Sequence, residues 1–156
     1  LGVYNSQTMK ELKRLGLISA TASFELKLAQ IRDLSKAIPT ELIAYGRLPL
    51  MITENCIIHN HSGQHTCSNV NLLTDRKGEW FPVVQAYGCR NEILNSKKLF
   101  LADRTQDYGR LGLWAARLMF TTENAMECAQ VLERYLGQGS YQPNEYTRGL
   151  YYRDVE

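Results

Sequence analysis

The side chains best suited to chemistry in this 156-residue sequence are three cysteines, Cys56, Cys67 and Cys89. The first two lie in a polar stretch, residues 54–69, which has no apolar face and also holds all three histidines. Thiolate and imidazole are the ligands that soft and borderline metals prefer, and a loop with little apolar surface needs something else to order it. We therefore predict that the three cysteines form one metal- or cluster-binding site.

The fourth ligand of this site has two candidates in the sequence. His59 follows Cys56 after a two-residue gap, which lets both side chains reach one ion. Cys128 falls about one turn into an expected helix and on an apolar stripe. It therefore either packs in the core or reaches the site from the end of that helix. The spacings match no standard zinc finger, and buried, unrelated cysteines with solvated histidines are the alternative interpretation.

Composition and charge are those of a globular protein. Apolar residues make up 44% of the chain, charged residues 22%, and the formal net charge is only +2. Such a charge does not by itself indicate nucleic-acid binding, and no apolar run approaches the ~20 residues of a membrane helix. Four cysteines in 156 residues, without a visible export signal, fit a reducing compartment better than a disulfide scaffold. We expect a cytoplasmic protein that does not bind membranes.

The elements that must position these side chains alternate short strands with amphipathic helices. Strands are expected over 1–4, 18–22, 41–45 and 114–120. Helices are expected from Ser6 to a stop at Gly16, from a cap at Ser23 to before Pro39, over 99–110, and from a cap at Thr122 to Leu136. Four such units make about half of an eight-unit barrel. This pattern predicts an α/β fold, a partial (βα) barrel equivalent to a TIM-like half barrel.

Residues 54–96 interrupt this alternation once, and we expect them to form an insertion. It combines the Cys/His-rich loop with a β-hairpin, in which 72–74 and 80–85 flank the turn 75–78. The whole chain, 1–156, is expected to be one domain, the carboxyl-terminal half of a larger barrel. Because a half barrel exposes strand edges, we expect its partner to be a missing amino-terminal half of the same polypeptide or a second subunit.

Several motifs, in one order along nearly the whole chain, resemble the collagenase-like peptidase family U-32. The matching segments are YNS at 4–6, SFEL at 23–26, YGRLPLM at 45–51, ENC at 54–56, LTDRKG at 73–78, FPV at 81–83, CRNEILNS at 89–96 and YTRGLYYR at 146–153. The resemblance implies a barrel-like catalytic region. In several relatives it also implies a four-iron four-sulfur cluster on cysteines, used in oxygen-independent hydroxylation of ubiquinone precursors or RNA bases.

Cys56, Cys67 and Cys89 resemble the cluster cysteines of those relatives, whereas Pro49 stands where some relatives place a further cysteine. The resemblance therefore implies a 4Fe-4S cluster, with zinc as the alternative, and makes RNA a candidate partner. Other relatives are classed as collagen-degrading peptidases, so the family name implies a hydrolase, a protease.

Three functions stay open at this point. An iron–sulfur enzyme component comes first, because thiolates suit iron and sulfide. A structural zinc site comes second, as a Cys3His set of Cys56, His59, Cys67 and Cys89. A thiol peptidase comes third, with Cys67 paired to His65 or His59. The chain has neither a His-Glu-x-x-His zinc helix nor a Gly-x-Ser-x-Gly elbow.

Three arginines of the matching segments, Arg47, Arg90 and Arg148, are candidates for substrate binding. A guanidinium group can hold a carboxylate or phosphate through two hydrogen bonds. Ordinary ion pairing with a nearby carboxylate is the alternative. Asn91, Glu92 and Asn95 follow Cys89 and are candidates to donate hydrogen bonds to its sulfur, or else to cap the turn before a helix expected at Ser96.

Overall fold

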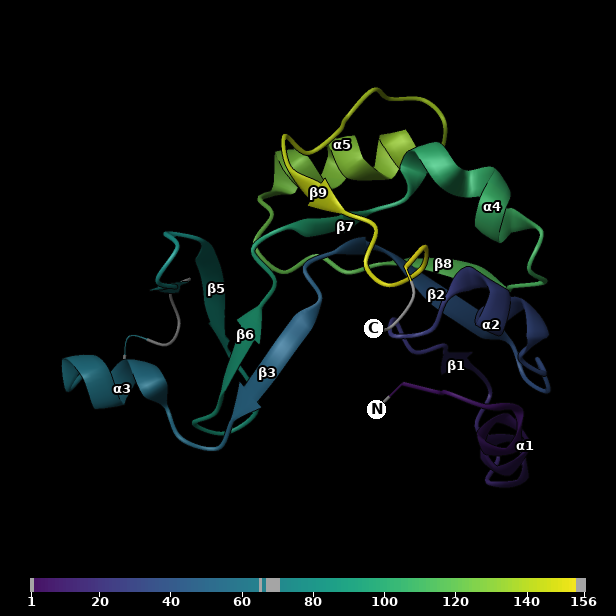
Figure 1. Cartoon of the computed structure of the whole chain (residues 1–156), viewed down its shortest axis with the longest axis horizontal. Helices are drawn as coiled ribbons and strands as arrows, with labels where there is room; N and C mark the ends of the chain where they lie inside the picture. The colour runs from purple at the N-terminus through teal and green to yellow at the C-terminus, as the bar shows by residue number, and fades with distance from the viewer. Residues whose placement is uncertain (1, 65, 67–70, 154–156) are drawn as a thin grey trace.

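The computed structural model describes residues 2–64, 66 and 71–153, which form two lobes (Figure 1). The small lobe is residues 49–94, built on a four-stranded sheet. The large lobe is residues 2–48 and 95–153, in which helices pack on a five-stranded sheet.

The large-lobe sheet is centred on one buried strand. Its strands are β1 (Ala20–Thr21), β2 (Thr40–Gly46), β7 (Lys98–Phe100), β8 (Ala115–Leu118) and β9 (Tyr146–Thr147). All seven residues of β2 are buried, as expected of a strand covered on both faces. β1 and β8 pair with β2 in parallel, whereas β7 pairs in antiparallel with its last two residues. β9 adds to β7 in parallel.

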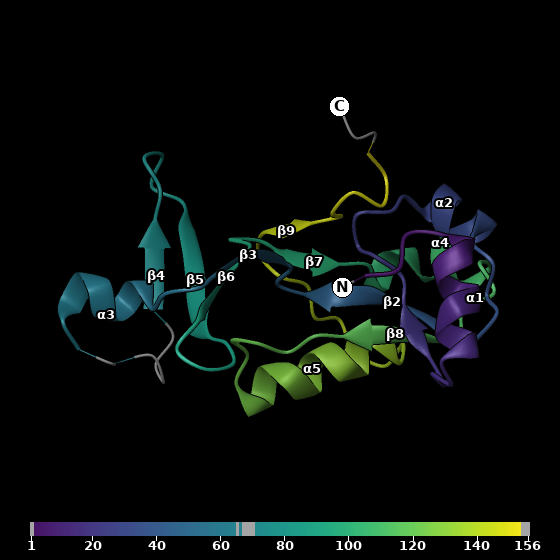
Figure 2. The ribbon, with the colours of Figure 1, turned by 90° about the horizontal axis from the view of Figure 1, so that it is seen from below.

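Five α-helices and one 3-10 helix lie within the described residues. They are α1 (Ser6–Arg14), α2 (Leu28–Asp33), α3 (Ile57–Ser62), η1 (Ala102–Arg104), α4 (Thr105–Gly109) and α5 (Ala125–Tyr135). Figure 2 shows α5 alongside β8, with α1, α2 and α4 gathered at the end of the large lobe far from the small lobe. Among the residues described, none of the helices combines the length and the apolar composition needed to cross a membrane.

Local caps set the helix ends, but α2 and α5 begin after Lys27 and Asn124 rather than after the expected caps Ser23 and Thr122. α1 begins at Asn5, whose side chain accepts a hydrogen bond from the Thr8 amide, and the chain turns away at Gly16, where φ is 81°. α5 begins at Asn124, which caps the Glu127 amide in the same way. This cap places the first turn of α5 next to β7, where it contributes to a polar cluster described below.

The four strands of the small lobe form an antiparallel sheet. In spatial order they are β3 (Pro49–Thr53), β6 (Asn91–Leu94), β5 (Trp80–Gln85) and β4 (Asn71–Thr74). The expected hairpin is confirmed, since β4 pairs with β5 from Asn71 opposite Val83 to Thr74 opposite Trp80. α3 packs on this sheet through Ile58, which joins Cys56 and Val83 in a small apolar cluster.

The expected half barrel is wrong. The described residues form one mixed sheet and one antiparallel sheet, and show neither a closed barrel nor half of one. After β2 the chain leaves for the small lobe and returns as β7, so the returning strand lies antiparallel beside the end of β2. The expected helix over 99–110 therefore starts as a strand, in which Leu99 and Phe100 are fully buried. β3, which precedes the expected insertion, pairs with β6 in the small-lobe sheet.

Candidate functional site

Two of the three predicted metal ligands lie together in the small lobe. Cys56 immediately precedes α3 and is buried, whereas Cys89 lies in the turn between β5 and β6 and is exposed. The two thiols lie close enough to interact. Desolvation and the neighbouring Cys56 thiol raise the pKa of Cys89 above its ordinary value. Cys67 and His65 lie outside the described residues.

Local hydrogen bonds explain why the chain brings these two turns together. The Cys56 sulfur accepts a hydrogen bond from the His59 amide at 3.4 Å, which starts α3. The Asn91 side chain accepts one from the Ile57 amide through its Oδ1 atom at 2.8 Å. Because Asn91 begins β6, two residues after Cys89, this bond holds the start of α3 against the turn that carries Cys89.

The amide nitrogen of Asn91, Nδ2, is a buried hydrogen-bond donor. Asn91 is fully buried, and within the described part of the chain its Nδ2 donor has no hydrogen-bond partner. An unpaired buried donor costs about 1–3 kcal/mol. Since Oδ1 of the same amide is bound next to Cys56, this donor lies close to the thiol pair. A metal-bound thiolate, or a sulfide of a cluster, is an acceptor of the required kind.

The metal-ligating side chains that the structure describes make up only part of a metal site. Over residues 2–64, 66 and 71–153, no group of three or more His, Cys, Asp or Glu side chains is arranged to hold a metal ion. Two thiols and a buried donor suit iron–sulfur or zinc chemistry, and a third thiolate would have to come from Cys67.

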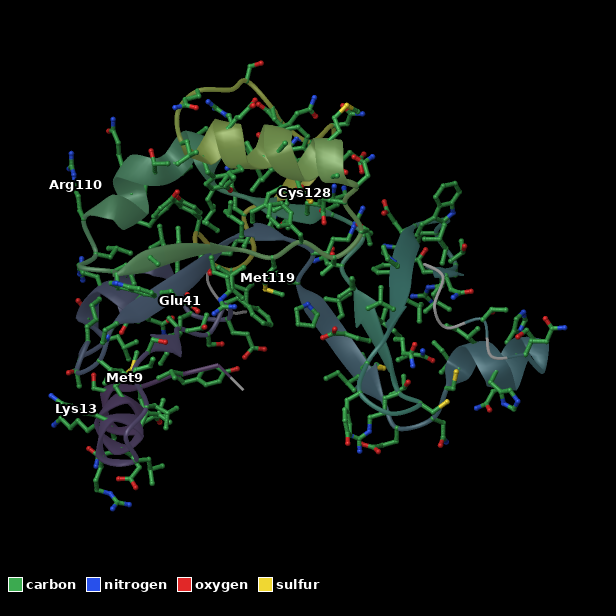
Figure 3. All side chains as sticks on the ribbon, turned by 180° about the vertical axis from the view of Figure 1, so that it is seen from behind. Met9, Lys13, Glu41, Arg110, Met119 and Cys128 are labelled. Carbon is green, nitrogen blue, oxygen red and sulfur yellow. The ribbon has the colours of Figure 1, made fainter. Side chains whose placement is uncertain are left out.

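The two candidates for a fourth ligand lie in different lobes. His59 lies one turn after Cys56 in α3, and its amide donates to the Cys56 sulfur. Cys128 lies on α5 in the large lobe, where it is partly buried (Figure 3). The structure therefore does not bring Cys128 to the thiol pair, and His59 is the candidate that the fold keeps beside it.

Two of the three candidate arginines are engaged in ion pairs. Arg90 holds Glu54 at 2.8 Å on the surface of the small lobe. Arg148 makes two 2.6 Å hydrogen bonds to the carboxylate of Asp103 in the large lobe. Arg47 differs, because its guanidinium donates to the backbone carbonyls of Asn95 and Ser96 and has no carboxylate partner among the described residues.

A second polar site escapes the sequence analysis. We call it the Lys98 cluster, and its members are Lys98 at the start of β7, Glu123 just before α5, Glu127 in the first turn of α5, and Tyr141. The Lys98 ammonium lies 3.1 Å from Glu123 and 2.5 Å from Glu127, and the Tyr141 hydroxyl donates to Glu127 at 2.6 Å. The only sequence signal is two glutamates four residues apart at a helix start, because Lys98 and Tyr141 join them through tertiary structure.

Hydrogen bonds within the Lys98 cluster keep its two carboxylates and its ammonium group charged. Burial alone would raise the pKa of Glu123 and of Glu127, but hydrogen bonds reverse this effect and both pKa values lie below the ordinary 4.5. For Glu123 the donors are the Thr121 amide and Lys98, and for Glu127 they are Lys98 and Tyr141. Burial likewise opposes the charge on Lys98, yet the two carboxylates raise its pKa. All three groups are therefore ionised at neutral pH.

Comparisons with known proteins leave the family open: no family model, curated protein or solved structure matches the chain.

Proposed function

We propose that this protein is the cluster-bearing component of an enzyme, with an iron–sulfur cluster held by Cys56, Cys89 and Cys67. One observation carries the proposal: two thiols from separate turns of the small lobe lie beside a buried amide donor that has no acceptor among the described residues. The resemblance of the cysteine segments to family U-32 supports a cluster rather than a single metal ion. When bound, such a cluster supplies electron transfer or an open iron.

The chain's own residues would hold, orient and shield the site. Asn91 would donate its Nδ2 hydrogen bond to a ligating sulfur, and such bonds tune both affinity and potential. Ile58 and Val83 pack beside Cys56 and exclude water from that side. Cys89 is exposed, so substrate or an electron donor would approach from its side.

The resemblance also supports a class of reaction. Oxygen-independent hydroxylation, of an RNA base or a small aromatic compound, is the activity that we propose. A thiolate site of this kind is maintained in a reducing compartment, so the proposal includes a cytoplasmic location. Among the described strands β8 pairs only with β2, so its other edge could pair with a second subunit or a further segment of the polypeptide.

A structural zinc ion is the second candidate. Among the described residues the apolar cluster of the small lobe is small, with Cys56, Ile58 and Val83 buried in it, so a metal would add stability to that of packing. His59 would then complete a Cys3His set, with Cys67 as the third sulfur. Nothing specific in the described residues favours a thiol peptidase, since Cys67 and His65 lie outside them.

Anaerobic purification followed by reconstitution with iron and sulfide tests the proposal. A brown protein with absorption near ~400 nm and about four irons per chain is expected. A colourless protein that binds zinc in preference would favour the structural zinc site and contradict the cluster. Gelatin cleavage by the metal-free protein, lost on Cys67→Ala, would instead support the peptidase.

A further inference from the structure

Three members of the Lys98 cluster, Lys98, Glu127 and Tyr141, line a pocket in the large lobe, whereas the thiol pair lies in the small lobe. The pocket has a volume of about 400 Å³, within the range of small-molecule sites. Its walls include Arg47, Lys98, Glu127, Tyr141 and Glu145. The site is independent of the proposed cluster, so each can be tested without the other.

Glu123 serves as the internal counter-charge of Lys98. Its side chain is 0% exposed. One carboxylate oxygen accepts from the Thr121 and Thr122 amides at 2.7 and 3.1 Å. The other lies 3.1 Å from Lys98 and accepts from the Tyr45 hydroxyl at 3.2 Å. Both oxygens are fully used, so Glu123 has no capacity left for a ligand.

Glu127 has capacity left. Its Oε1 atom receives the hydrogen bonds from both Lys98 and Tyr141, whereas Oε2 has no hydrogen-bond partner within the described residues. The side chain is 26% exposed on the pocket wall. The Lys98 cluster holds one positive charge, on Lys98, and two negative charges, on Glu123 and Glu127. Because Glu123 balances Lys98, the cluster is left with one net negative charge, on Glu127.

Arg47 carries the complementary charge on the same pocket wall. Its Nη1 atom donates to the Asn95 carbonyl at 2.9 Å and to the Ser96 carbonyl, which fixes the guanidinium plane. Its Nε atom makes only a long 3.4 Å contact with Thr122. In the part of the chain that the structure describes, neither a carboxylate nor any other acceptor meets Nη2. The remaining carboxylate of the wall, Glu145, lies 3.8 Å from Lys97 instead.

We propose that this pocket binds a small zwitterion, with its ammonium group on Glu127 and its carboxylate on Arg47. The two side chains form no ion pair with each other in the described structure, although they share one pocket, so a dipolar ligand can satisfy both at once. A simple cation or anion would satisfy only one of them. Charge-assisted hydrogen bonds at both ends give such a ligand its orientation.

A neighbouring pocket gives the ligand room to be larger than a single amino acid. It has a volume of about 420 Å³, shares Arg47, Ser96 and Glu145 with the first pocket, and reaches Trp80 of the small lobe. Trp80 is mostly exposed, so its ring offers an apolar surface for the body of a longer ligand.

Titration calorimetry on the wild-type protein tests the proposal with a series of ω-amino acids: glycine, β-alanine, 4-aminobutanoate and 6-aminohexanoate. Butylamine and butanoate are the single-charge controls. At least one zwitterion should bind at least about tenfold more tightly than either control. If none does, or if butylamine alone binds as well, the proposal is overturned.

Three variants locate the site. Glu127→Gln and Arg47→Gln should each weaken binding of the best zwitterion by at least about tenfold. Glu133→Gln, a matched change on an exposed residue of the same helix, should leave it unchanged. Unaltered binding by Glu127→Gln would refute the site. If either pocket variant fails to fold, the wild-type ligand series still decides the question.

Discussion

Replacing Lys98 by methionine should destabilise the protein strongly. Methionine keeps most of the side-chain volume but removes the ammonium that lies between Glu123 and Glu127. Lys98 is only 11% exposed and Glu123 is not exposed at all, so water cannot replace the lost partner.

The magnitude follows from the burial of Glu123. Removing one member of a buried ion pair costs about 3–5 kcal/mol, because the other charge is left in a low-dielectric site. Glu123 keeps two backbone amides and the Tyr45 hydroxyl, and Glu127 is partly exposed. We therefore expect the lower end, about 3 kcal/mol. For a chain of this size that corresponds to a fall in Tm of about 6–12 °C.

The stability lost on Lys98→Met should be smaller at low pH than at neutral pH. In the wild type the pKa of Glu123 lies below 4.5, so its contribution to stability is present above 4.5 and is lost as pH falls through the folded pKa. Without Lys98, burial should raise the pKa of Glu123, so the variant avoids its penalty by protonation at low pH. The stability difference between the two proteins should therefore shrink from pH 7 to pH 4.5.

Urea denaturation of both proteins at the two pH values measures this difference. Lys97→Met is the matched control, because Lys97 lies 3.8 Å from Glu145 and both side chains are exposed. It should cost less than about 1 kcal/mol. A loss below about 1 kcal/mol for Lys98→Met, or an equal loss at both pH values, would refute the buried-charge reasoning.

Three further changes test other parts of the structure. Gly46→Ala should cost at least about 3 kcal/mol in thermal unfolding, because φ is 120° and the new Cβ would lie 2.1 Å from the Met119 carbonyl oxygen. Tyr135→Phe should cost about 1–3 kcal/mol in urea unfolding, since its hydroxyl accepts from the Leu101 amide and donates to the Ala44 carbonyl. Asn91→Leu should lower metal affinity by about 10–100-fold in chelator competition.

Each of these changes has a control or an outcome that contradicts it. Gly63→Ala also has a positive φ, 70°, but its Cβ would meet open space, so it should cost only about 1–2 kcal/mol. Tyr87→Phe, at a residue that is 93% exposed, should be neutral. Equal losses for the two glycine variants would contradict the steric argument at Gly46. Equal losses for the two tyrosine variants would contradict the hydrogen-bond argument at Tyr135. Unchanged metal affinity in Asn91→Leu would show that its amide does not face the site.

The parts of the fold that depend on local pattern could be predicted from the sequence. The apolar spacing of Met9 and Leu12 and the stop at Gly16 correctly place α1, and the Asp75–Gly78 turn correctly places the β4–β5 hairpin. Leu99 and Phe100 show why the barrel prediction fails. A short apolar run fits a strand or a helix equally well, and pairing with the end of β2 and with β9 makes it a strand.

In the candidate site, too, local sequence predicts the residue types and tertiary structure decides which of them meet. The residue types of Cys56 and Cys89 indicate metal chemistry, and the fold brings their thiols together. No pattern along the chain could show that Cys128 belongs to the other lobe. The Lys98 cluster was not predicted because its members come from three separate segments. Its ion pairs become strong only because folding buries them away from water, which sequence patterns do not show.

The most direct test of the central proposal is the iron content of matched cysteine variants. Cys56→Ala, Cys89→Ala and Cys128→Ala would be purified anaerobically and reconstituted alongside the wild type. We expect Cys56→Ala and Cys89→Ala to lose most of the iron and the absorption near ~400 nm, and Cys128→Ala to retain both. Iron that is retained without Cys56 or Cys89, or lost equally without Cys128, would contradict a cluster site in the small lobe.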